Sequence, residues 1–586
     1  MQETQNPFPL LHRRVLQLDA TDNVAVALRN LSAGETVLVG GQPCVVASPI
    51  PAKHKFALRD LKAGDPVIMY GVLVGKATQP IRRGELIATS NVRHEAAETH
   101  PREASLSWTA PDVSRWQDRT FLGYRRSDGQ VGTRNYWLVV PLVFCENRNI
   151  RALQQAFEHG LGFASGHAYQ RQVARLADLY TKGRIEEIQR FAPELEPAAQ
   201  EGHRLFPNVD GIRFLTHEGG CGGTREDARL LCGLIAGYIR HPNVAGATVL
   251  SLGCQHAQIS LLREEIAKRD AHFNKPLLIF DQQASGLEFD MVSRAIRETF
   301  LGLIQANQAT RKPAPLSQLV VGLKCGGSDG FSGITANPAI GHTADLIAVL
   351  GGRTILSEFP ELCGVEQSLI DRCVTRELAD RYLSLMQAYA ARAAAIGSGF
   401  DSNPSPGNIK DGIITDAMKS AGAVKKGGTS PVVDVLDYPE YATRPGLSLL
   451  CTPGNDVEAV TGQVGAGANI VLFTTGLGTP TGNPIAPVVK LSTNSALANR
   501  MPDIIDFDCG PIITGEKTIQ QSGEEILEYI LQVASGEKHT MPKSIGRKIS
   551  FPGSVVFRSS ESSECVSFRF GQSGCDQGRG SECDRN

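Results

Sequence analysis

From Tyr136 onward, short apolar runs alternate along the chain with longer amphipathic stretches. The runs YWLVVPLVF and GATVLSLGCQ end in small or polar residues, and EDARLLCGLIAGYIRH between them has the apolar spacing of a helix. Buried strands that alternate with helices indicate an α/β fold with mainly parallel sheets. A second series starts near Leu316 and contains a long amphipathic stretch that ends at Gly397. We therefore predict two α/β units, at residues 123–312 and 313–545.

The N-terminal part of the chain has a different pattern, in which β-branched runs follow turns that contain glycine. LRNLSAGETVLV begins at Leu28, LRDLKAGDPVIM begins at Leu58, and a weaker third copy, IRRGELIATSNV, begins at Ile81. Short strands joined by such turns predict a small all-β domain at residues 15–95. The polar segment 96–122 is then either a linker or a long loop that wraps the next domain.

The composition fits a soluble globular protein of several domains. The 586 residues exceed what one hydrophobic core supports, and 41% of them are hydrophobic and 20% charged. A net charge of −2 argues against general binding of nucleic acid, and no apolar run has the length of a membrane span or of a signal peptide. Thirteen cysteines without a CxxC pair indicate reduced thiols, so we expect a cytoplasmic protein.

Cys145, His217, Cys221 and Cys254 stand at or just beyond the ends of apolar runs. Ligands of open α/β sheets bind at the carboxyl ends of the strands, so these side chains could converge on iron, manganese or zinc. The alternative is that the cysteines are ordinary buried thiols. The chain has neither a P-loop nor a GxGxxG motif after a strand, which disfavours nucleotide-dependent chemistry.

Two further segments contain groups suited to a polar ligand. The segment GLKCGGSDGFSGITANPAIG is too rich in glycine for a strand or a helix, so we expect its backbone to approach another group closely. In the β domain, SPIPAKHKFALRDL holds His54 and Lys55 side by side at a turn. A surface His–Lys pair without a function is the alternative. The candidate contact residues of the glycine-rich segment are Gly326, Gly327, Ser328 and Asp329.

Several long motifs resemble, in the same order, those of the altronate and galactarate dehydratase family. They include KHKFAL, GTRN, HEGGCGGTRED, CGGSDGFSGITANPAIG, TPGND and TTGLGTPTGNPIAPVVK. The resemblance extends from about residue 19 to about residue 540. It implies an N-terminal β-clip domain of the SAF type, followed by two α/β units.

The resemblance also implies a hydro-lyase that converts D-altronate to 2-dehydro-3-deoxy-D-gluconate and water in galacturonate breakdown, with Fe²⁺ or Mn²⁺ as cofactor. His54 and Lys55 are then expected to carry the acid and base chemistry. Arg134 and Asn135 of GTRN, together with residues 326–329, are expected to bind the sugar acid. The expected metal ligands are Cys145, His217, Cys221 and Cys254. The expected partner is a small sugar acid, not nucleic acid or membrane, and a homo-oligomer is compatible with the sequence.

Three other functions stay open at this point. Galactarate or another aldarate could replace altronate as the substrate, because the sequence does not distinguish a terminal hydroxymethyl group from a second carboxylate. The chain could also bind sugar acids without turning them over. An iron–sulfur hydratase is the third alternative.

Two segments depart from the resemblance. The stretch around residues 160–208 is longer than in shorter relatives, and we interpret it as added helices. After residue 545 the periodicity ends, and a shifted reading of one permitted coding of KISFPGSVVFRS gives DFIPWKRGVSL, an ending typical of the family. We therefore interpret residues 546–586 as a disordered tail that results from a frameshift shortly before Lys548, in the gene or in its sequencing. A genuine disordered tail is the alternative.

Overall fold

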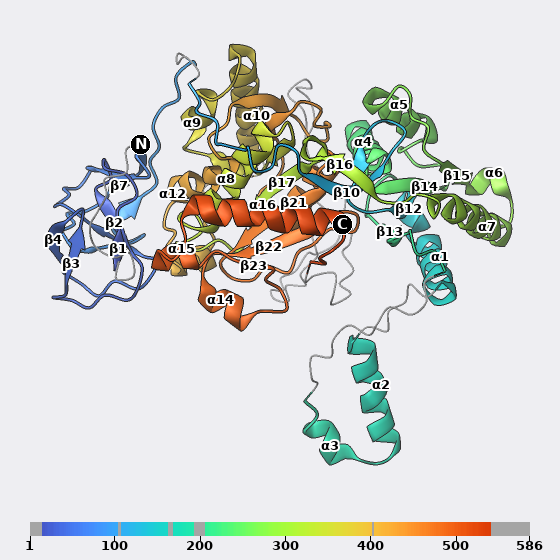
Figure 1. The fold of residues 1–586 in the computed structure, drawn as a ribbon, viewed down its shortest axis with the longest axis horizontal. Coiled ribbons are helices and arrows are strands. Elements are labelled where there is room, and N and C mark those ends of the chain that lie inside the picture. Colours follow the sequence, from blue (N-terminus) through green and yellow to red (C-terminus); the bar gives the residue numbers. More distant parts are fainter. Residues whose placement is uncertain are drawn as a thin grey trace, which may run out of the picture.

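The computed structural model describes residues 14–102, 107–161, 168–192, 205–395, 397–400 and 403–540. Within them, a β module and two α/β units follow one another along the chain, as predicted (Figure 1). The interpretation of residues 546–586 as a frameshifted tail concerns a segment outside the described residues.

The β module (residues 14–95) consists of short antiparallel strands. One sheet has the order β1-β2-β5-β8 and a second has the order β6-β7-β9, while β3 and β4 form a hairpin. The strands are β1 (Val15–Leu16), β2 (Val24–Ala27), β3 (Thr36–Val39), β4 (Gln42–Val45), β5 (Lys55–Ala57), β6 (Pro66–Met69), β7 (Val72–Ala77), β8 (Leu86–Ile87) and β9 (Val92–Arg93).

The weak sequence repeat of the β module is a repeat of one turn. Gly34, Gly64 and Gly84 all have positive φ angles, of 79°, 89° and 82°. In each turn the acidic residue after the glycine accepts a hydrogen bond from the backbone N–H three residues before it, at 3.1, 2.8 and 2.9 Å. Only glycine adopts this backbone conformation without strain, which explains the repeated Ala-Gly or Arg-Gly.

The central unit is a four-stranded parallel sheet with the order β13-β12-β14-β15. Its strands are β12 (Tyr136–Pro141), β13 (Gly211–Phe214), β14 (Val244–Ser251) and β15 (Leu277–Asp281). Its helices are α1 (Asn147–Gly160), α4 (Arg225–Arg240), α5 (Ile259–Arg269), α6 (Gln282–Ser285) and α7 (Glu288–Ala306). The predicted added helices exist as α2 (Ala168–Thr181) and α3 (Ile185–Gln189), which pack on each other apart from the sheets (Figure 1).

The C-terminal unit is a seven-stranded parallel sheet with the order β19-β20-β18-β17-β21-β22-β23. Its strands are β17 (Val320–Cys325), β18 (Arg353–Leu356), β19 (Val432–Leu436), β20 (Gly446–Leu450), β21 (Ile470–Thr475), β22 (Val488–Ser492) and β23 (Phe507–Asp508). Its helices are α8 (Ala336–Val349), α9 (Glu366–Ile370), α10 (Arg376–Ala395), α11 (Pro406–Lys410), α12 (Asp416–Ala423), α13 (Asp456–Gly465), α14 (Ser495–Arg500), α15 (Pro511–Thr514) and α16 (Ile519–Ser535).

The segment between the β module and the central unit lies along the C-terminal unit, whereas we expected either a linker or a loop that wraps the next domain. The backbone N–H of His100 donates to Gln367, and Trp108 Nε1 donates to Thr429 Oγ1. The segment is also shorter than predicted, because β10 (Thr120–Arg125) begins inside it and pairs with β16 (Lys312–Pro315) and β11 (Val131–Gly132).

The three units share their cores. Val67, Met69 and Val74 of the β module pack in the same cluster as Ala417 and Met418 of α12. The central and C-terminal units share a second cluster around α4 and α13, which contact each other. The β module is therefore fixed against the C-terminal unit by apolar burial.

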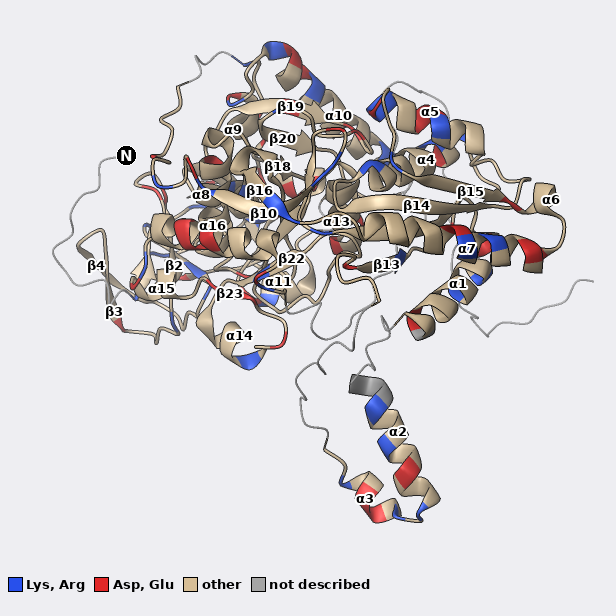
Figure 2. Ribbon diagram, turned by 45° about the vertical axis from the view of Figure 1, so that its right-hand side comes forward, with Lys and Arg blue, Asp and Glu red and all other residues tan. Residues whose placement is uncertain are grey.

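The two parallel sheets meet at the amino ends of their strands. Asn243, just before β14, donates to the carbonyl of Asn469, just before β21. The carboxyl ends point away from each other: β15 leads to α6 on one side of the molecule, while the β module lies on the other (Figures 1 and 2). Because ligands bind at carboxyl ends, each sheet can carry its own site.

Candidate active site

Lys53, His54 and Lys55, which we call the KHK turn, lie against the glycine-rich loop that follows β17. Lys53 Nζ lies 3.0 Å from Asp329 Oδ2 and 3.0 Å from Asp411 Oδ1. Burial opposes the charge on Lys53, but Asp329 and Asp411 together raise its pKa. The β module therefore places a firmly cationic side chain between two carboxylates of the C-terminal unit.

Two glycines allow the KHK turn to come this close. A Cβ atom at Gly330 or at Gly412 would lie 2.4 Å from the carbonyl oxygen of Lys53, which is closer than real contacts allow. Lys53 itself has a φ angle of 74°, an unusual conformation for a residue with a side chain. Lys55 Nζ donates a 2.5 Å hydrogen bond to the carbonyl of Gly412. The glycine-rich loop thus approaches a second domain.

Asp329 is buried at the centre of this contact and accepts hydrogen bonds at both carboxylate oxygens. Oδ1 accepts from Ser332 Oγ at 3.1 Å and from the N–H of Phe331 at 3.2 Å. Oδ2 accepts from Thr493 Oγ1 at 3.0 Å and from Asn494 Nδ2 at 3.3 Å, in addition to its ion pair with Lys53. The carboxylate is held in one orientation by donors on two sides.

Lys55 has the chemistry of a potential base. Its side chain is buried, and burial lowers its pKa to about 7, although Asp329 acts in the opposite direction. An amine with this pKa is partly neutral at neutral pH and can accept a proton. Neighbouring His54 is half-buried, and burial lowers its pKa as well.

A small cavity lies between the KHK turn and the C-terminal unit, where the glycine-rich loop meets α12. Burial raises the pKa of Tyr70, which keeps its hydroxyl protonated. The polar side chains that line the cavity are Lys55, Tyr70, Ser328, Asp329, Asn337 and Lys419.

Beside this cavity lies a charge cluster made of three lysines, three carboxylates and one thiol. Lys426 Nζ lies 2.8 Å from Cys325 Sγ and 3.1 Å from Glu358. Lys324 pairs with Glu358 and Asp456, and Lys419 pairs with Glu361 at 2.9 Å. The members of the charge cluster are Lys324, Cys325, Glu358, Glu361, Lys419, Lys426 and Asp456.

The acidic groups of the charge cluster differ in the direction in which their surroundings shift their pKa values. Burial, followed by Glu361, raises the pKa of Glu358. Burial also opposes ionisation of Glu361, but Lys419, Lys324 and Lys426 hold its pKa at about 2. Burial raises the pKa of the Cys325 thiol to about 11. The side chain of Glu358 is buried, and its backbone is strained, because its φ angle is 72°.

Cys325, Glu358 and Glu361 form the one group in the described part of the chain whose ligand atoms all lie within 4.8 Å of one another. A cation fits there poorly, because Lys426 already contacts both Cys325 and Glu358, and Lys419 pairs with Glu361. The three ammonium groups balance the three carboxylates of the cluster. A divalent ion would require a lysine to leave or to lose its proton.

The predicted metal-binding cysteines lie in the central unit, on three loops that meet. The N–H of Phe144, next to Cys145, donates to the carbonyl of Gly219 at 3.0 Å. The N–H of Ala257, in the loop of Cys254, donates to the carbonyl of Gly220 at 3.1 Å. Burial, followed by the charges of Cys221 and Cys254, raises the pKa of Cys145.

The ring nitrogens of His217, the fourth expected metal ligand, are hydrogen-bonded to backbone groups. Its ring is buried, Nε2 lies 2.8 Å from the carbonyl oxygen of Pro141, and Nδ1 accepts from the N–H of Gly219 at 3.1 Å. Since a carbonyl only accepts, Nε2 carries the proton and Nδ1 is the acceptor. Both ring nitrogens are thus used to shape the loop, and burial lowers the pKa of His217.

Comparison with known proteins agrees with this architecture. Residues 13–95 match the altronate/galactarate dehydratase SAF domain, residues 123–307 match the second domain of D-galactarate dehydratase/altronate hydrolase, and residues 316–553 match the C-terminal domain of D-galactarate/altronate dehydratase. The chain belongs to the galactarate and altronate dehydratase family.

Characterised relatives of this dehydratase family extend over nearly the whole chain. Altronate dehydratase of Escherichia coli K12 is 34% identical over 530 residues, covering 89% of this chain and 95% of the relative. Altronate dehydratase of Bacillus subtilis 168 is 33% identical with the same coverage. Galactarate dehydratase (L-threo-forming) of E. coli K12 is 32% identical over 552 residues, covering 93% of this chain and 96% of the relative.

Two residues expected to bind substrate in this dehydratase lie elsewhere. Arg134 is buried and donates to the carbonyls of Thr133 and Val533, at 2.6 and 2.9 Å. Asn135 donates to the carbonyls of Asn208 and Ala306. Both stand at the amino end of β12, whereas Asp329 follows the carboxyl end of β17, and a six-residue strand spans roughly 20 Å. The positions do not support a carboxylate clamp, because both side chains hold backbone segments together.

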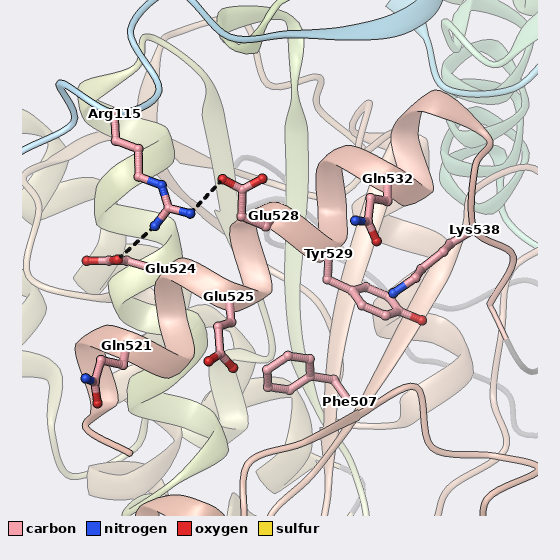
Figure 3. Close-up of a pocket in the computed structure, with 9 residues that line it drawn as sticks. All are labelled: Arg115, Phe507, Gln521, Glu524, Glu525, Glu528, Tyr529, Gln532 and Lys538. Carbon is pink, nitrogen blue, oxygen red and sulfur yellow. Dashed lines mark ion pairs between the residues drawn. The ribbon is translucent and has the colours of Figure 1, made fainter. Parts of the chain in front are cut away.

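The described surface also has an open pocket on α16, which we do not consider the active site (Figure 3). Arg115, from the segment between the β module and the central unit, forms ion pairs of 3.5 Å with Glu524 and with Glu528. Trp116 Nε1 donates to Glu528 at 2.9 Å. These contacts attach this segment to α16, and the acidic face of this helix is visible in Figure 2. They do not contact the KHK turn.

Sequence reasoning missed Lys53 and the charge cluster. Lys53 belongs to the same short KHK motif as His54 and Lys55, and the sequence does not distinguish it from an ordinary surface lysine. The signal for the charge cluster was a lysine inside the apolar strand GLKC, acids inside SEFPEL, and the pair in VKKGG. Charges in such apolar surroundings need partners, but the sequence does not say which ones.

Proposed function

We propose that this chain dehydrates D-altronate to 2-dehydro-3-deoxy-D-gluconate at the interface between the KHK turn and the loop of Asp329, within galacturonate breakdown. The observation that carries the proposal is the burial of Lys55, with a pKa of about 7, beside the Lys53–Asp329 ion pair. The altronate dehydratases with which the chain aligns almost throughout support the choice of substrate.

The reaction removes the proton on C2 of the sugar acid and the hydroxyl on C3, and the resulting enol rearranges to the 2-keto acid. Neutral Lys55, which lines the small cavity beside Asp329, accepts the C2 proton. Lys53, whose ammonium state is stabilised by two carboxylates, binds the substrate carboxylate. His54, next to Lys55, donates a proton to the leaving hydroxyl, which departs as water, and then takes up the proton that Lys55 has accepted.

Fe²⁺ or Mn²⁺ is proposed as the cofactor, and the cysteine loops fit a metal better than the charge cluster does. Cys145 and Cys254 are exposed and Cys221 is partly exposed, so the three sulfurs are accessible to an ion. The residues that would hold it are Cys145, Cys221 and Cys254.

A substrate panel tests the proposal. Anaerobic protein supplied with Fe²⁺ should form a 2-keto acid from D-altronate with a higher kcat/KM than from galactarate or other aldonates and aldarates. Lys55→Met should lower kcat by about 10²–10⁴-fold, whereas the exposed Lys62→Met in the same module should leave it unchanged. Equal kcat in the two variants would refute the role of Lys55.

Galactarate is the second candidate substrate, because galactarate dehydratase aligns over 93% of this chain. A higher kcat/KM for galactarate than for D-altronate would identify an aldarate as the substrate. The proposed active site would stay the same. Binding of sugar acids without any product, with Fe²⁺ or with Mn²⁺, would instead indicate a non-catalytic binding protein.

Metal dependence is tested on the same protein. Treatment with a chelator should abolish activity, and Fe²⁺ or Mn²⁺ should restore it. Full activity in protein shown to be metal-free would refute the cofactor.

A further inference from the structure

The cavity beside the KHK turn has the size of one hydroxyl group. The space inside it that is open to a water-sized group is about 10 Å³, and one water molecule needs roughly 10–15 Å³ of such space. A sugar acid of six carbons is much larger than that. The cavity therefore suits a single substituent of the substrate, and the rest of the sugar acid lies outside it.

Ser328 presents a buried hydroxyl to this cavity. The residue is 4% exposed, and its Oγ has no hydrogen-bond partner in the described part of the chain. The carbonyl of Ser328 accepts a hydrogen bond from Asn408 Nδ2 at 2.7 Å, which holds the backbone at this position. A buried hydroxyl without a partner destabilises a fold, so such a group in the wall of a cavity indicates a ligand.

Neighbouring polar side chains of the cavity are already bonded to protein groups. Asn337 Nδ2 donates to a backbone carbonyl at 3.0 Å, and Oδ1 of the same residue accepts from Thr474 at 2.6 Å. Ser332 Oγ donates to the carboxylate of Asp329 at 3.1 Å and accepts from the backbone N–H of Asp329 at 2.9 Å. These bonds are internal to the C-terminal unit, whereas Ser328 Oγ is left to bind a ligand.

Tyr70, in the turn between β6 and β7, brings a second hydroxyl to the cavity. Its φ angle is 59°, an unusual conformation for a residue with a side chain. Two glycines give its ring room, because a Cβ atom at Gly333 or at Gly422 would lie 2.4 or 3.4 Å from Tyr70 Oη. Burial raises the pKa of Tyr70, so its hydroxyl keeps its proton and can donate a hydrogen bond.

The residues that line the cavity indicate which hydroxyl of the substrate enters it. Lys55, the proposed acceptor of the C2 proton, lines the cavity, whereas His54, the proposed donor to the leaving oxygen on C3, does not. The oxygen that enters the cavity is therefore bonded to C2 and not to C3. The carboxylate on C1 has two oxygens, and the cavity has room for one.

We propose that Ser328 Oγ and Tyr70 Oη bind the C2 hydroxyl of the sugar acid and select substrates that carry one. Tyr70 donates a hydrogen bond to this oxygen, and Ser328 Oγ accepts one from it. Both bonds persist while C2 loses its proton and its oxygen becomes that of the enol, so they orient the C2–H bond toward Lys55. This role rests on the proposed dehydration at Lys55, and it adds Tyr70 of the β module to the groups that contact the substrate.

Two analogues of D-altronate measure this contact without any substitution in the protein. The 3-deoxy acid keeps the C2 hydroxyl but has no leaving group, and the 2,3-dideoxy acid lacks both hydroxyls. Titration calorimetry of the full chain supplied with Mn²⁺ should give a Kd that is roughly tenfold or more higher for the dideoxy acid, because a site built to bond a hydroxyl rejects a ligand without it. Equal Kd values would overturn the inference, and so would the absence of binding by either acid.

Variants then assign the difference in Kd to the two side chains. In Ser328→Ala/Tyr70→Phe the two Kd values should agree within about twofold, because both groups that recognise the hydroxyl are gone. Tyr180→Phe changes an exposed tyrosine of α2, so it is the matched control and should keep the wild-type ratio of Kd values. Circular dichroism checks that each variant is folded. A wild-type ratio in the folded double variant would overturn the inference.

The outcomes separate this role from the proposed function. Normal dehydration of D-altronate by the double variant would preserve the dehydratase and overturn the role of the two hydroxyls. Recognition of the C2 hydroxyl that depends on Ser328 and Tyr70, in protein that dehydrates none of the sugar acids, would preserve the binding site and refute the proposed function.

Discussion

At the scale of single residues, the candidate active site depends on how burial changes the chemistry of ordinary side chains. Lys55 and Lys53 are two residues apart, yet burial lowers the pKa of Lys55 to about 7, while Asp329 and Asp411 overcome burial and raise the pKa of Lys53. One turn therefore presents one lysine that is partly neutral at neutral pH and another that stays an ammonium.

The pKa of Lys55 predicts how activity depends on pH. Only the neutral amine accepts a proton, so kcat/KM should rise with pH through about 7 and then level off. Measurement of kcat/KM from pH 5 to 9 checks this. Lys55→Arg should not restore activity, because a guanidinium stays protonated. A profile without a rise near pH 7 would contradict the assignment.

The same shift predicts an effect on stability with a defined sign. The pKa of Lys55 in the folded protein lies below the usual 10.5, so folding disfavours its ammonium form. The penalty is complete below about pH 7 and disappears as the pH approaches 10.5. Lys55→Met should therefore raise Tm more at pH 6 than at pH 9. An equal change in Tm at both pH values would contradict the burial of a titrating amine.

Two aspartates that share Lys53 should differ in importance. Asp329 is buried and fixed by donors on both oxygens, whereas Asp411 is partly exposed. Asp329→Asn should lower kcat/KM by at least tenfold more than Asp411→Asn, since an ion pair near solvent contributes little. Steady-state kinetics with circular dichroism as a folding control compares the two variants. Equal losses would mean that only the charge around Lys53 matters.

At the scale of elements, the glycine-rich loop and the β module are complementary surfaces. A methyl group at Gly330 would lie 2.4 Å from the carbonyl oxygen of Lys53, so contact at this point requires glycine. Gly330→Ala should displace the KHK turn and lower kcat/KM at least tenfold while the protein stays folded. Gly407→Ala, in the nearby helix α11, meets only Ser405 Oγ, at 3.8 Å, and is the matched control. Normal kinetics of Gly330→Ala would show that docking of the turn is not needed.

At the scale of the whole molecule, the units contribute unequally to the candidate site. The KHK turn comes from the β module and its partners come from the C-terminal unit, while the cysteine loops belong to the central unit. None of the helices in the described parts of the chain is long and apolar enough to span a membrane. The two sheets meet at the amino ends of their strands. The KHK turn and the cysteine loops, which lie at the carboxyl ends, are therefore separated from each other.

The hairpin of α2 and α3 should be dispensable for the proposed reaction. The two helices pack on each other and lie apart from the sheets (Figure 1). Replacement of residues 162–204 by a flexible glycine–serine linker should leave kcat and KM within about twofold, because exposed segments away from a site have little energetic effect. Kinetics and thermal denaturation of this variant provide the check. A large loss of activity with normal folding would assign the hairpin a role in the reaction or in assembly.

The sequence by itself determined the order and type of the units. Alternation of apolar runs with helices predicted two parallel sheets, and repeated turns with glycine predicted the β module, because both patterns depend on contacts close in the chain. The long motifs likewise indicated the family. The proximity of Cys145, Cys221 and Cys254 was predicted for the same reason, since parallel neighbouring strands end at one edge.

Only the tertiary structure decided which side chains meet. The pairing of Lys53 with Asp329 and Asp411 joins residues from different units, and no local pattern encodes such a contact. Arg134 and His217 have residue types suited to a site, but the fold uses their polar atoms to bond backbone carbonyls and N–H groups. The lowered pKa of Lys55 could not be predicted from the sequence either. It depends on burial beneath a second domain, and burial results from packing and not from the neighbouring residues in the chain.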